Sequence, residues 1–461
     1  MRKRFAAASG ILGTCSDTSE IKPAVDSGRR LLIVATGSLL FLVAGTLLFP
    51  DTFSSAGLRV GGIRLSPISI LFALAAPQIA VFILAQRHKL TFGLLDFFLL
   101  TSTAFVLIRG VFANDSQVNT LALVLGYSAY TLIIYYGTSL AAQDERVLRA
   151  FVYMLVTLGV IIAAYAMVEF LLNKNIIFGD LISKRVAGRD FNRSGSTLGH
   201  PIALGIFLVQ LAPFLVFFFG RAGTFFKKFA WNAGIVLVAV ALETTFTKGS
   251  WIAAIALGAM GIAWFAWREP KSRKPILVLL VTVGAAFMIF NLFFRGTVTN
   301  SVFSDTRING SVNTRWYMWN RAPGAFLLQP WIGAGEFQGA AQVERVHSEE
   351  QQFVVDPTSI GNVYLTWLVE GGAIGCLLIG GTLVFVGRQV WQLLRSGGKA
   401  GMWAIPLAAA LSVGLLQGLT SDTFLVFPAM VVFWMLAGLV RALSENGTRK
   451  IHLPELGRKD G

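Results

Sequence analysis

Three cationic side chains stand in short polar segments between long apolar stretches of the chain. Arg193 opens the segment RSGSTLGHPIALG, Lys248 lies in ETTFTKGSW, and Arg315 opens RWYMWNRAPGAFLLQPWIGAGEF. A guanidinium binds phosphate through two parallel hydrogen bonds, an ammonium binds it as a point charge, and a helix N-terminus adds main-chain N–H donors. The rings of Trp316 and Trp319 can stack on a sugar. The pattern predicts a site for a ligand that contains phosphate and sugar.

Each segment also fits a purely structural interpretation. Arg193 fits an arginine at the membrane interface, and His200 fits a cap on the helix that follows. Lys248 can pair with Glu243, and the aromatic residues after Arg315 fit an interfacial belt. The residues alone leave both interpretations open.

The elements that must position these residues are membrane spans. The chain has 461 residues, 55% of them hydrophobic and 14% charged, with a mean hydropathy of +0.66, whereas a soluble domain carries about 25% charged residues. About a dozen apolar segments are long enough to cross a bilayer as helices, which takes roughly 17–25 residues. We therefore expect an all-α polytopic membrane protein with a single domain at 31–441. The predicted spans are 31–49, 67–86, 91–113, 119–141, 150–172, 196–219, 229–247, 250–267, 276–294, 360–387, 402–418 and 423–441.

Charge between the spans predicts the orientation. Short loops rich in Lys and Arg face the cytoplasm, which places both tails, 1–30 and 442–461, on the inner side. The outer connections are nearly neutral except for two. The loop 173–195 carries Lys174, Lys184, Arg185, Arg189 and Arg193, and the loop 295–358, between spans nine and ten, carries Arg295, Arg307, Arg315, Arg321 and Arg345. Cations gathered on the outer face predict an anionic ligand there. Within the longer loop, 314–328 has the spacing of an amphipathic helix.

Charged residues inside the spans fall mostly at their outer ends. They are Arg109, Glu169, Glu243, Lys248 and Asp422, and together they suggest a polar cavity that opens outward. Asp96 falls at the inner end of its span, where we expect a structural role. A transporter would instead favour charges and broken helices at the membrane midplane.

The composition argues against several other classes. The net charge of +15 comes largely from short cytoplasmic turns, so nucleic-acid binding is not expected. The two cysteines, Cys15 and Cys376, have no metal-ligand spacing and form no disulfide framework. The chain has no Asp-x-Asp pair, and we expect neither a metal nor another cofactor.

Four segments, in this order on a twelve-span chain, resemble the O-antigen ligase and Wzy-type polymerase superfamily between about residue 190 and residue 380. RSGSTLGHPIALG is similar to the family's entry to its sixth span. FTKGSW resembles a turn usually written Ser-Arg-Gly, and RWYMWNRAPGAFLLQPWIGAG resembles Arg-Trp-x-x-Trp…Pro-x-x-Gly-x-Gly. Asn362-Val-Tyr-Leu with Glu370-Gly-Gly-Ala-Ile-Gly is similar to Asn-x-Tyr-Leu…Glu-x-Gly.

The resemblance implies a GT-C-type glycosyltransferase of the bacterial inner membrane that faces the periplasm. Its substrates would be glycans linked by pyrophosphate to undecaprenol. By this carry-over Arg193, Lys248 and Arg315 hold the pyrophosphate, whose developing charge needs cations. The residues predicted to bind substrate are Arg189, Trp316, Trp319, Arg321, Asn362, Tyr364 and Glu370. Expected partners are a flippase and a chain-length regulator.

One departure separates two activities. Ligases of this family carry a histidine just before the asparagine of the fourth motif, where this chain has Gly361. The segment Ser359-Ile-Gly-Asn-Val-Tyr-Leu instead resembles a polymerase motif, and GHPIALG resembles exopolysaccharide polymerases. We therefore expect a polymerase, with an O-antigen ligase as the alternative and a transporter or flippase of an anionic glycolipid as the alternative from another class. The general base stays open among His200, Glu336, Glu344, His347 and Asp356.

Overall fold

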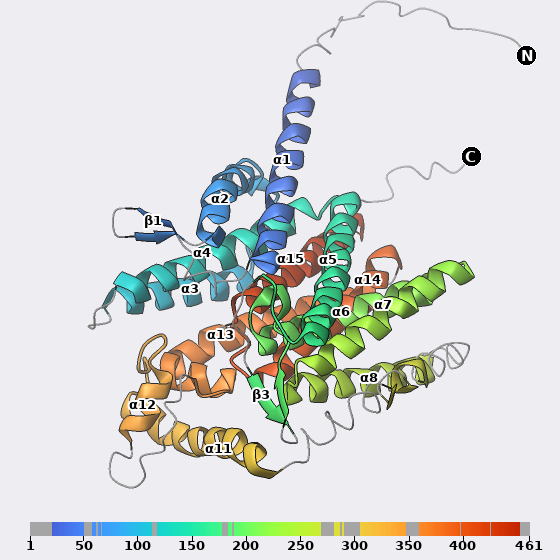
Figure 1. Cartoon of the computed structure of the whole chain (residues 1–461). Helices are drawn as coiled ribbons and strands as arrows, with labels where there is room; N and C mark the ends of the chain where they lie inside the picture. Colours follow the sequence, from blue (N-terminus) through green and yellow to red (C-terminus); the bar gives the residue numbers. More distant parts are fainter. Residues whose placement is uncertain are drawn as a thin grey trace, which may run out of the picture.

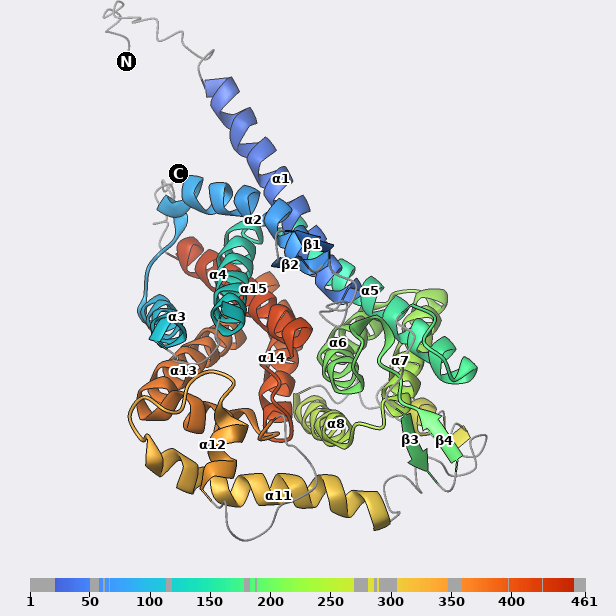
Figure 2. The ribbon, with the colours of Figure 1, turned by 60° about the vertical axis from the view of Figure 1, so that its left-hand side comes forward.

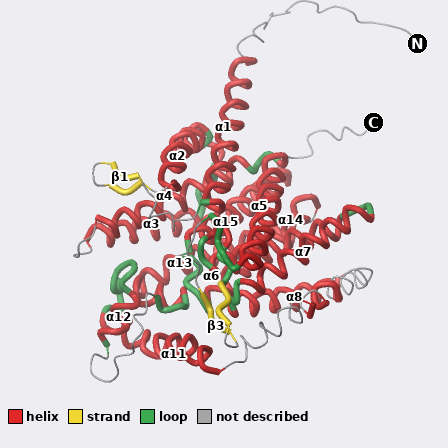
Figure 3. Tube along the Cα trace, viewed as in Figure 1, coloured by secondary structure: helices red, strands yellow, loops and turns green. Residues whose placement is uncertain are grey.

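The protein is a bundle of α-helices with two small β-hairpins (Figures 1 and 3). In this computed structural model the described residues are 21–49, 58–60, 63–65, 67–112, 118–177, 183–186, 189–268, 281–285, 288–289, 305–346, 359–396, 398–424 and 426–451. The α-helices are α1 (Ile21–Leu48), α2 (Pro67–Ala85), α3 (Leu94–Phe112), α4 (Val118–Ala141), α5 (Glu145–Leu172), α6 (Pro201–Arg221), α7 (Phe225–Thr244), α8 (Lys248–Arg268), α11 (Asp305–Leu328), α12 (Gly339–Arg345), α13 (Val363–Ser396), α14 (Gly398–Gly418) and α15 (Phe427–Ile451). Two 3₁₀ turns are η2 (Arg87–Lys89) and η3 (Ser196–Leu198). The antiparallel hairpins are β1 (Leu58–Val60) with β2 (Ile63–Leu65), and β3 (Ser183–Val186) with β4 (Arg189–Asn192).

Nine helical segments among the described residues are long and apolar enough to cross a membrane. They are Gly28–Leu48, Pro67–Ala85, Leu94–Val111, Glu145–Leu172, Pro201–Arg221, Phe225–Thr244, Val363–Ser396, Gly401–Gly418 and Phe427–Glu445. Large apolar side chains such as Leu74 and Leu377 remain exposed on them, as lipid-facing residues do. The protein is therefore a multi-pass membrane protein. Helices α4 and α8 match two more predicted spans, but 276–294 lies mostly outside the described residues, so the count of twelve stays a prediction.

Local sequence signals fix several helix ends. Asp144 precedes α5 and accepts a hydrogen bond from Arg146 N at 2.8 Å, and Thr224 does the same for Lys227 N before α7 at 3.3 Å. These are N-cap residues that satisfy otherwise unpaired N–H groups. Asn173 ends α5 in the left-handed conformation, with φ of 51°, which asparagine tolerates better than most residues.

The core lies along α15 and α6, which are the most enclosed of the nine segments, with 94% and 78% of their apolar windows buried. Helix α15 packs against α4, α13 and α14, and α6 packs against α5, α7 and α14. Helix α14 thereby joins a group formed by α1–α4, α13 and α15 to a group formed by α5–α8 (Figure 2). Tyr135, Phe151, Phe207 and Phe433 are fully buried within this core.

Helix α11 lies across one end of the bundle and packs against α12 and α13 (Figures 1 and 2). It forms a small second core in which Met318 and Ala322 contact Val343, Ile360 and Val369. The predicted amphipathic helix at 314–328 is confirmed, although α11 begins earlier, at Asp305.

Helix α13 is broken at Gly372, where φ is 62° and ψ is −166°. The segment 330–335 inserts its main chain at this break. Ala334 N donates to Val369 O at 2.8 Å and Gly335 N to Glu370 O at 3.2 Å. In return Ala373 N donates to Pro330 O at 2.8 Å and Ile374 N to Trp331 O at 3.1 Å. The long loop therefore supplies main-chain hydrogen bonds where the helix departs from regular geometry.

Two glycines make this insertion possible. A β-carbon at Gly372 would lie 2.6 Å from Gly333 N, and one at Gly333, where φ is 70°, would collide with Glu370 O. Only glycine combines a positive φ with so close a main-chain approach. The Pro-x-x-Gly-x-Gly segment and the Glu-Gly-Gly segment thus pack directly against each other through their main chains.

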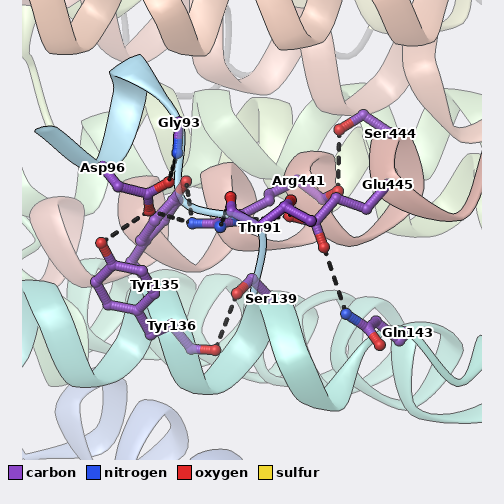
Figure 4. A network of polar contacts seen from close by, with 10 residues as sticks. All are labelled: Thr91, Gly93, Asp96, Tyr135, Tyr136, Ser139, Gln143, Arg441, Ser444 and Glu445. Atoms are coloured by element: carbon purple, nitrogen blue, oxygen red, sulfur yellow. Dashed lines mark hydrogen bonds and ion pairs between the residues drawn. The ribbon is translucent and has the colours of Figure 1, made fainter. Parts of the chain in front are cut away.

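The end of α15 away from α11 is closed by a buried ion network (Figure 4). Arg441, which is 1% exposed, pairs with Asp96 of α3 and with Glu445, 2.9 Å away. Tyr136 OH donates to Asp96 Oδ1 at 2.8 Å, and Arg441 Nη2 donates to Thr91 O at 3.0 Å. This places Asp96 in the structural role expected for it.

Some predicted boundaries differ from the structure. The span predicted from residue 196 begins as α6 at Pro201, because 194–200 form hydrogen-bonded turns that pack onto α5. Helix α1 already begins at Ile21, inside the predicted tail 1–30, and α15 runs to Ile451, inside the predicted tail 442–461. Neither hairpin was expected from the sequence.

Candidate functional site

The segment after β4 is held in place by a buried carboxylate. Glu169, at the end of α5, accepts hydrogen bonds from Gly195 N at 3.2 Å and Ser196 N at 2.7 Å. Ser194 N donates to Thr244 O at 3.1 Å, which ties this segment to the end of α7. Glu169 therefore helps to position Arg193 by fixing the residues that follow it. The sequence indicated Glu169 only as one of several charged residues around a polar cavity.

Arg193 is fixed to the turn between α7 and α8. Its Nε donates to Thr245 O at 2.8 Å and its Nη2 to Thr247 Oγ1 at 3.1 Å. Burial, and then the nearby charge of Arg315, lower the pKa of Arg193 to about 10. The guanidinium stays charged at neutral pH, and its orientation is set before any ligand arrives.

The side chains of Lys248 and Arg315 make no hydrogen bond or ion pair with any residue that the structure describes. The alternative in which Lys248 pairs with Glu243 is therefore not seen. Glu243 is 5% exposed, and its Oε2 has no hydrogen-bond partner among the described residues. A charge left without a partner near a protein surface is a natural contact for a ligand of opposite sign.

The three cations lie in one region. Arg315 is close enough to Arg193 and to Lys248 for direct electrostatic interaction with both. Burial lowers the pKa of Arg315, and the carboxylate of Asp422 opposes this shift. Cations from three separate segments thus lie near one another, with one carboxylate beside them, and their role in binding a ligand stays a prediction.

Asp422 organises the start of α13. Its Oδ2 accepts from Gly361 N at 3.0 Å and its Oδ1 from Thr366 Oγ1 at 2.6 Å. Gly361 has φ of 71°, and a β-carbon added there would lie 3.4 Å from Arg315 Cγ. The sequence signalled Asp422 only as a charge at a span end, so its link to Gly361 and Arg315 was missed.

His200 caps α6. Its Nδ1 accepts a hydrogen bond from Ile202 N at 3.1 Å, and Pro201 takes the first helical position. Burial, and then the charge of Arg193, lower the pKa of His200. A neutral imidazole that accepts at Nδ1 carries its proton on Nε2. In this arrangement His200 offers the site a hydrogen-bond donor.

Two predicted substrate contacts at the start of α13 make intramolecular bonds. Asn362 Oδ1 accepts from Tyr364 N at 3.0 Å and from Leu365 N at 3.2 Å. The Tyr364 hydroxyl donates to Leu415 O at 2.7 Å. These bonds cap α13 and tie it to α14, so the two side chains hold Gly361 in position.

The aromatic residues of α11 divide between two faces. Trp319 Nε1 donates to Ile360 O at 3.2 Å, whereas Trp316 is 62% exposed. Arg321 lies over the ring of Tyr317, with Cζ 3.4 Å from its centroid. Trp319 thus anchors α11, and Trp316 is placed where a ligand can reach it, whereas Arg321 Nη1 is buried without a hydrogen-bond partner among the described residues.

A second group of charges surrounds the break in α13. Arg109 Nη1 lies 3.2 Å from Glu336 Oε1, and Arg109 Nη2 donates to Glu370 O. Glu370 is 5% exposed, and its Oε1 accepts from Gly339 N at 3.0 Å. Burial raises the pKa of Glu336, and the charge of Arg109 opposes this rise. Glu336 and Glu370 therefore lie together in a group of charges that does not include Arg193.

Other predicted site residues are not placed at the cation cluster by the described residues. His347 and Asp356 lie outside the described residues, and Arg189 lies in β4, where only the backbone is described. Glu344 is exposed on α12. Among the described residues no group of three His, Cys, Asp or Glu side chains could hold a metal ion. Metal independence stays a prediction.

The fold and the site define a multi-pass membrane protein with a cation cluster at one end of its helices. Residues 233–380 match the family described as O-antigen ligase, which confirms the resemblance over that segment and brings Lys248, Arg315 and Glu370 within it. Members of that family are membrane enzymes of glycosyltransferase type. No match was found among curated proteins.

Proposed function

We propose that the protein is a periplasm-facing glycosyltransferase of the bacterial inner membrane that polymerises lipid-linked oligosaccharide repeat units into exopolysaccharide or O-antigen. The observation that carries this proposal is the pair Lys248 and Arg315, whose side chains form no hydrogen bond or ion pair within the described part of the chain, beside the fixed guanidinium of Arg193. Three cations on three segments fit a pyrophosphate better than a single phosphate or carboxylate. The match of 233–380 to the O-antigen ligase family supports the same class.

The donor would be a glycan attached through its anomeric carbon to undecaprenyl pyrophosphate. The hydroxyl at the non-reducing end of the next lipid-linked repeat unit attacks that carbon, and a glycosidic bond forms as the carbon–oxygen bond to pyrophosphate breaks. Undecaprenyl pyrophosphate leaves with the electron pair, and the acceptor proton passes to a base that stays unassigned. Arg193, Lys248 and Arg315 stabilise the charge that develops on the leaving group.

Gly361 favours polymerisation over ligation. The family resemblance places the histidine of ligases at this position, and in this chain the position lies directly against Arg315. Glycine leaves space there and supplies no base. A ligase that transfers polymer to the lipid A core would then need its base elsewhere, so it remains the second candidate.

The break in α13 favours an enzyme over a transporter. Broken helices of transporters leave main-chain carbonyls free to coordinate ions. Here Val369 O accepts from Ala334 N, while Glu370 O accepts from Gly335 N and from Arg109. These two carbonyls are already used within the protein, so the break offers no such ion site through them.

The test is the size-resolved profile of lipid-linked glycans in a clean deletion strain. Single repeat units accumulated on undecaprenyl pyrophosphate are the expected result. Full-length lipid-linked polymer beside an unsubstituted lipid A core would identify a ligase instead. An unchanged profile would exclude both activities and favour transport of an anionic glycolipid, which reconstitution in vesicles would test. The expected supply of repeat units by a flippase and the action of a chain-length regulator belong to the same proposal.

A further inference from the structure

A cavity of about 160 Å³ lies between α3, α4, α13 and α15. Its wall includes Thr103, Tyr127 and Trp367, together with both carboxylate residues at the α13 break, Glu336 and Glu370. None of the three clustered cations lines it. It is therefore a separate space from the pyrophosphate site proposed above.

The cavity and the cation cluster are nevertheless neighbours. Asp422 interacts electrostatically with Arg315 on one side and with Glu370 on the other. Phe424, two residues along the chain, lines the cavity and has its ring centroid 5.2 Å from that of Trp367. A ligand that fills the cavity would lie next to one held by the cations.

The polar wall of the cavity carries more acid than base. Arg109 pairs with Glu336, and its other nitrogen is bonded to the main-chain oxygen of Glu370. The Glu370 carboxylate itself is held by main-chain N–H groups, such as that of Gly339. Two carboxyl groups beside a single guanidinium offer acceptors for hydrogen-bond donors.

The rest of the wall is mainly apolar and aromatic, with several Ser and Thr residues. The hydroxyls of Ser102, Thr103 and Thr382 are bonded to carbonyls of their own helices, at 2.9, 2.8 and 2.9 Å. An engineered protein cavity of about 150 Å³ binds benzene, so this volume accommodates one six-membered ring. Apolar walls with a few converging polar groups are typical of small-molecule sites.

A sugar ring fits this chemistry better than a lipid chain. Hydroxyl groups of a sugar would donate to the two carboxyl groups while its apolar face stacks on Trp367 or Tyr127. An isoprenoid chain would remove water from the same carboxyl groups without offering a hydrogen bond, which is costly.

We propose that this cavity binds the terminal sugar of the acceptor glycan, with Glu336 and Glu370 accepting hydrogen bonds from its hydroxyl groups. The inference rests on the proposed glycosyltransferase function and adds the place of the acceptor. It puts acceptor and donor next to each other, with Asp422 near both.

Direct binding of a lipid-free probe tests the proposal without relying on polymer synthesis. The probe is the oligosaccharide released by mild acid from the lipid-linked repeat unit, which has neither pyrophosphate nor lipid. Its binding to the purified full-length protein in nanodiscs is measured by calorimetry. Thr103→Phe fills the cavity. Ala104→Phe is the matched control, because Ala104 is the next residue of α3 and is exposed.

Thr103→Phe and Glu336→Gln are each expected to weaken binding of the oligosaccharide at least tenfold, whereas Ala104→Phe leaves it unchanged. Unweakened binding in both cavity variants would overturn the proposal. The proposal would also be overturned if Thr103→Phe no longer bound undecaprenyl phosphate that carries no glycan, because the cavity would then hold the lipid chain. If the deletion strain shows an unchanged glycan profile while the oligosaccharide still binds in the cavity, the enzymatic function fails and the sugar site stands.

Discussion

Gly361 lies against the side chain of Arg315, because a β-carbon at position 361 would stand 3.4 Å from Arg315 Cγ and 3.5 Å from Nε. The same glycine has φ of 71° and donates its N–H to Asp422. One residue therefore sets both the space beside the arginine and the start of α13.

Gly361→Ala should reduce polymer synthesis, because alanine is strained in the left-handed conformation at the point where the main chain passes Arg315. The left-handed conformation should also cost about 1–2 kcal/mol of stability. Gly387→Ala is the control, since that glycine lies further along the chain, inside α13, with open space around it. Wild-type polymer output from Gly361→Ala would contradict the close coupling of these two residues.

Arg315→Ala should slow polymerisation by roughly 30-fold, which corresponds to about 2 kcal/mol of transition-state stabilisation. Arg193→Ala and Lys248→Ala should have effects of similar size, measured as initial rates in reconstituted membranes. Arg149→Ala serves as control, because that arginine is surface-exposed and its ion pair among the described residues is with Glu145, one turn away. If neither Arg315→Ala nor Arg193→Ala changed polymer amount or length, the pyrophosphate assignment would be wrong.

Stability should fall at acid pH through His200. Because its pKa in the folded state is lowered, the folded protein binds the proton less readily than the unfolded chain, whose histidine titrates near 6.5. The contribution of His200 is complete above that pH and is lost as the pH falls through the lowered value. Protonation also removes the Nδ1 acceptor that caps α6.

Thermal unfolding of wild type and His200→Asn at pH 7.5 and pH 5 measures this effect. Asparagine is a strong N-cap that does not titrate, so the variant should lose less stability between the two pH values. All other acidic and basic groups are common to both proteins. Equal losses would show that His200 does not titrate in this range.

Gly372→Ala should destabilise the protein by at least about 2 kcal/mol, through its positive φ and the collision with 330–335. Gly380→Ala, in the same helix with no heavy atom within 4 Å of its would-be β-carbon, should be neutral. Denaturation curves in detergent compare the two. Similar stabilities would mean that the helix break can close.

Asp96→Ala should cost about 3–5 kcal/mol, because it leaves the buried charge of Arg441 without its partner from α3. The exposed pair Glu145–Arg149 offers the contrast, since Glu145→Ala should cost less than about 0.5 kcal/mol. Thermal shift of the two variants against wild type gives the comparison. A small loss of stability in Asp96→Ala would mean that Glu445 alone is enough to compensate the charge of Arg441.

The helices could be predicted from the sequence because hydropathy acts locally. Spans such as 67–86 and 119–141 agree with α2 and α4 within a residue. The hairpin β3–β4 was missed because its strands are four residues long and rich in charge, which gives no apolar alternation. The start of α6 was predicted too early. Residues 194–200 are buried because they form hydrogen bonds to α5, and their own composition does not signal this.

The candidate site was predictable in its cations and not in its scaffold. Arg193, Lys248 and Arg315 stand out because positive charge is rare on the outer side of a membrane protein. Glu370 and Asn362 carried the same family resemblance, yet they mainly fix main-chain groups of Gly339 and Tyr364. Asp422 was not singled out as a site residue because its partners are 56 and 61 residues away in the chain.

The exchange of hydrogen bonds at Gly372 also limits how substrates can arrive. Swinging the segment 330–335 away from α13 would break four main-chain hydrogen bonds, at a net cost of roughly 2–6 kcal/mol. We therefore expect this part of the long loop to stay in place while substrates bind. Under the proposed function, the lipid-linked glycan would enter sideways from the bilayer between helices, and the growing polymer would leave by a route other than one opened by lifting this loop.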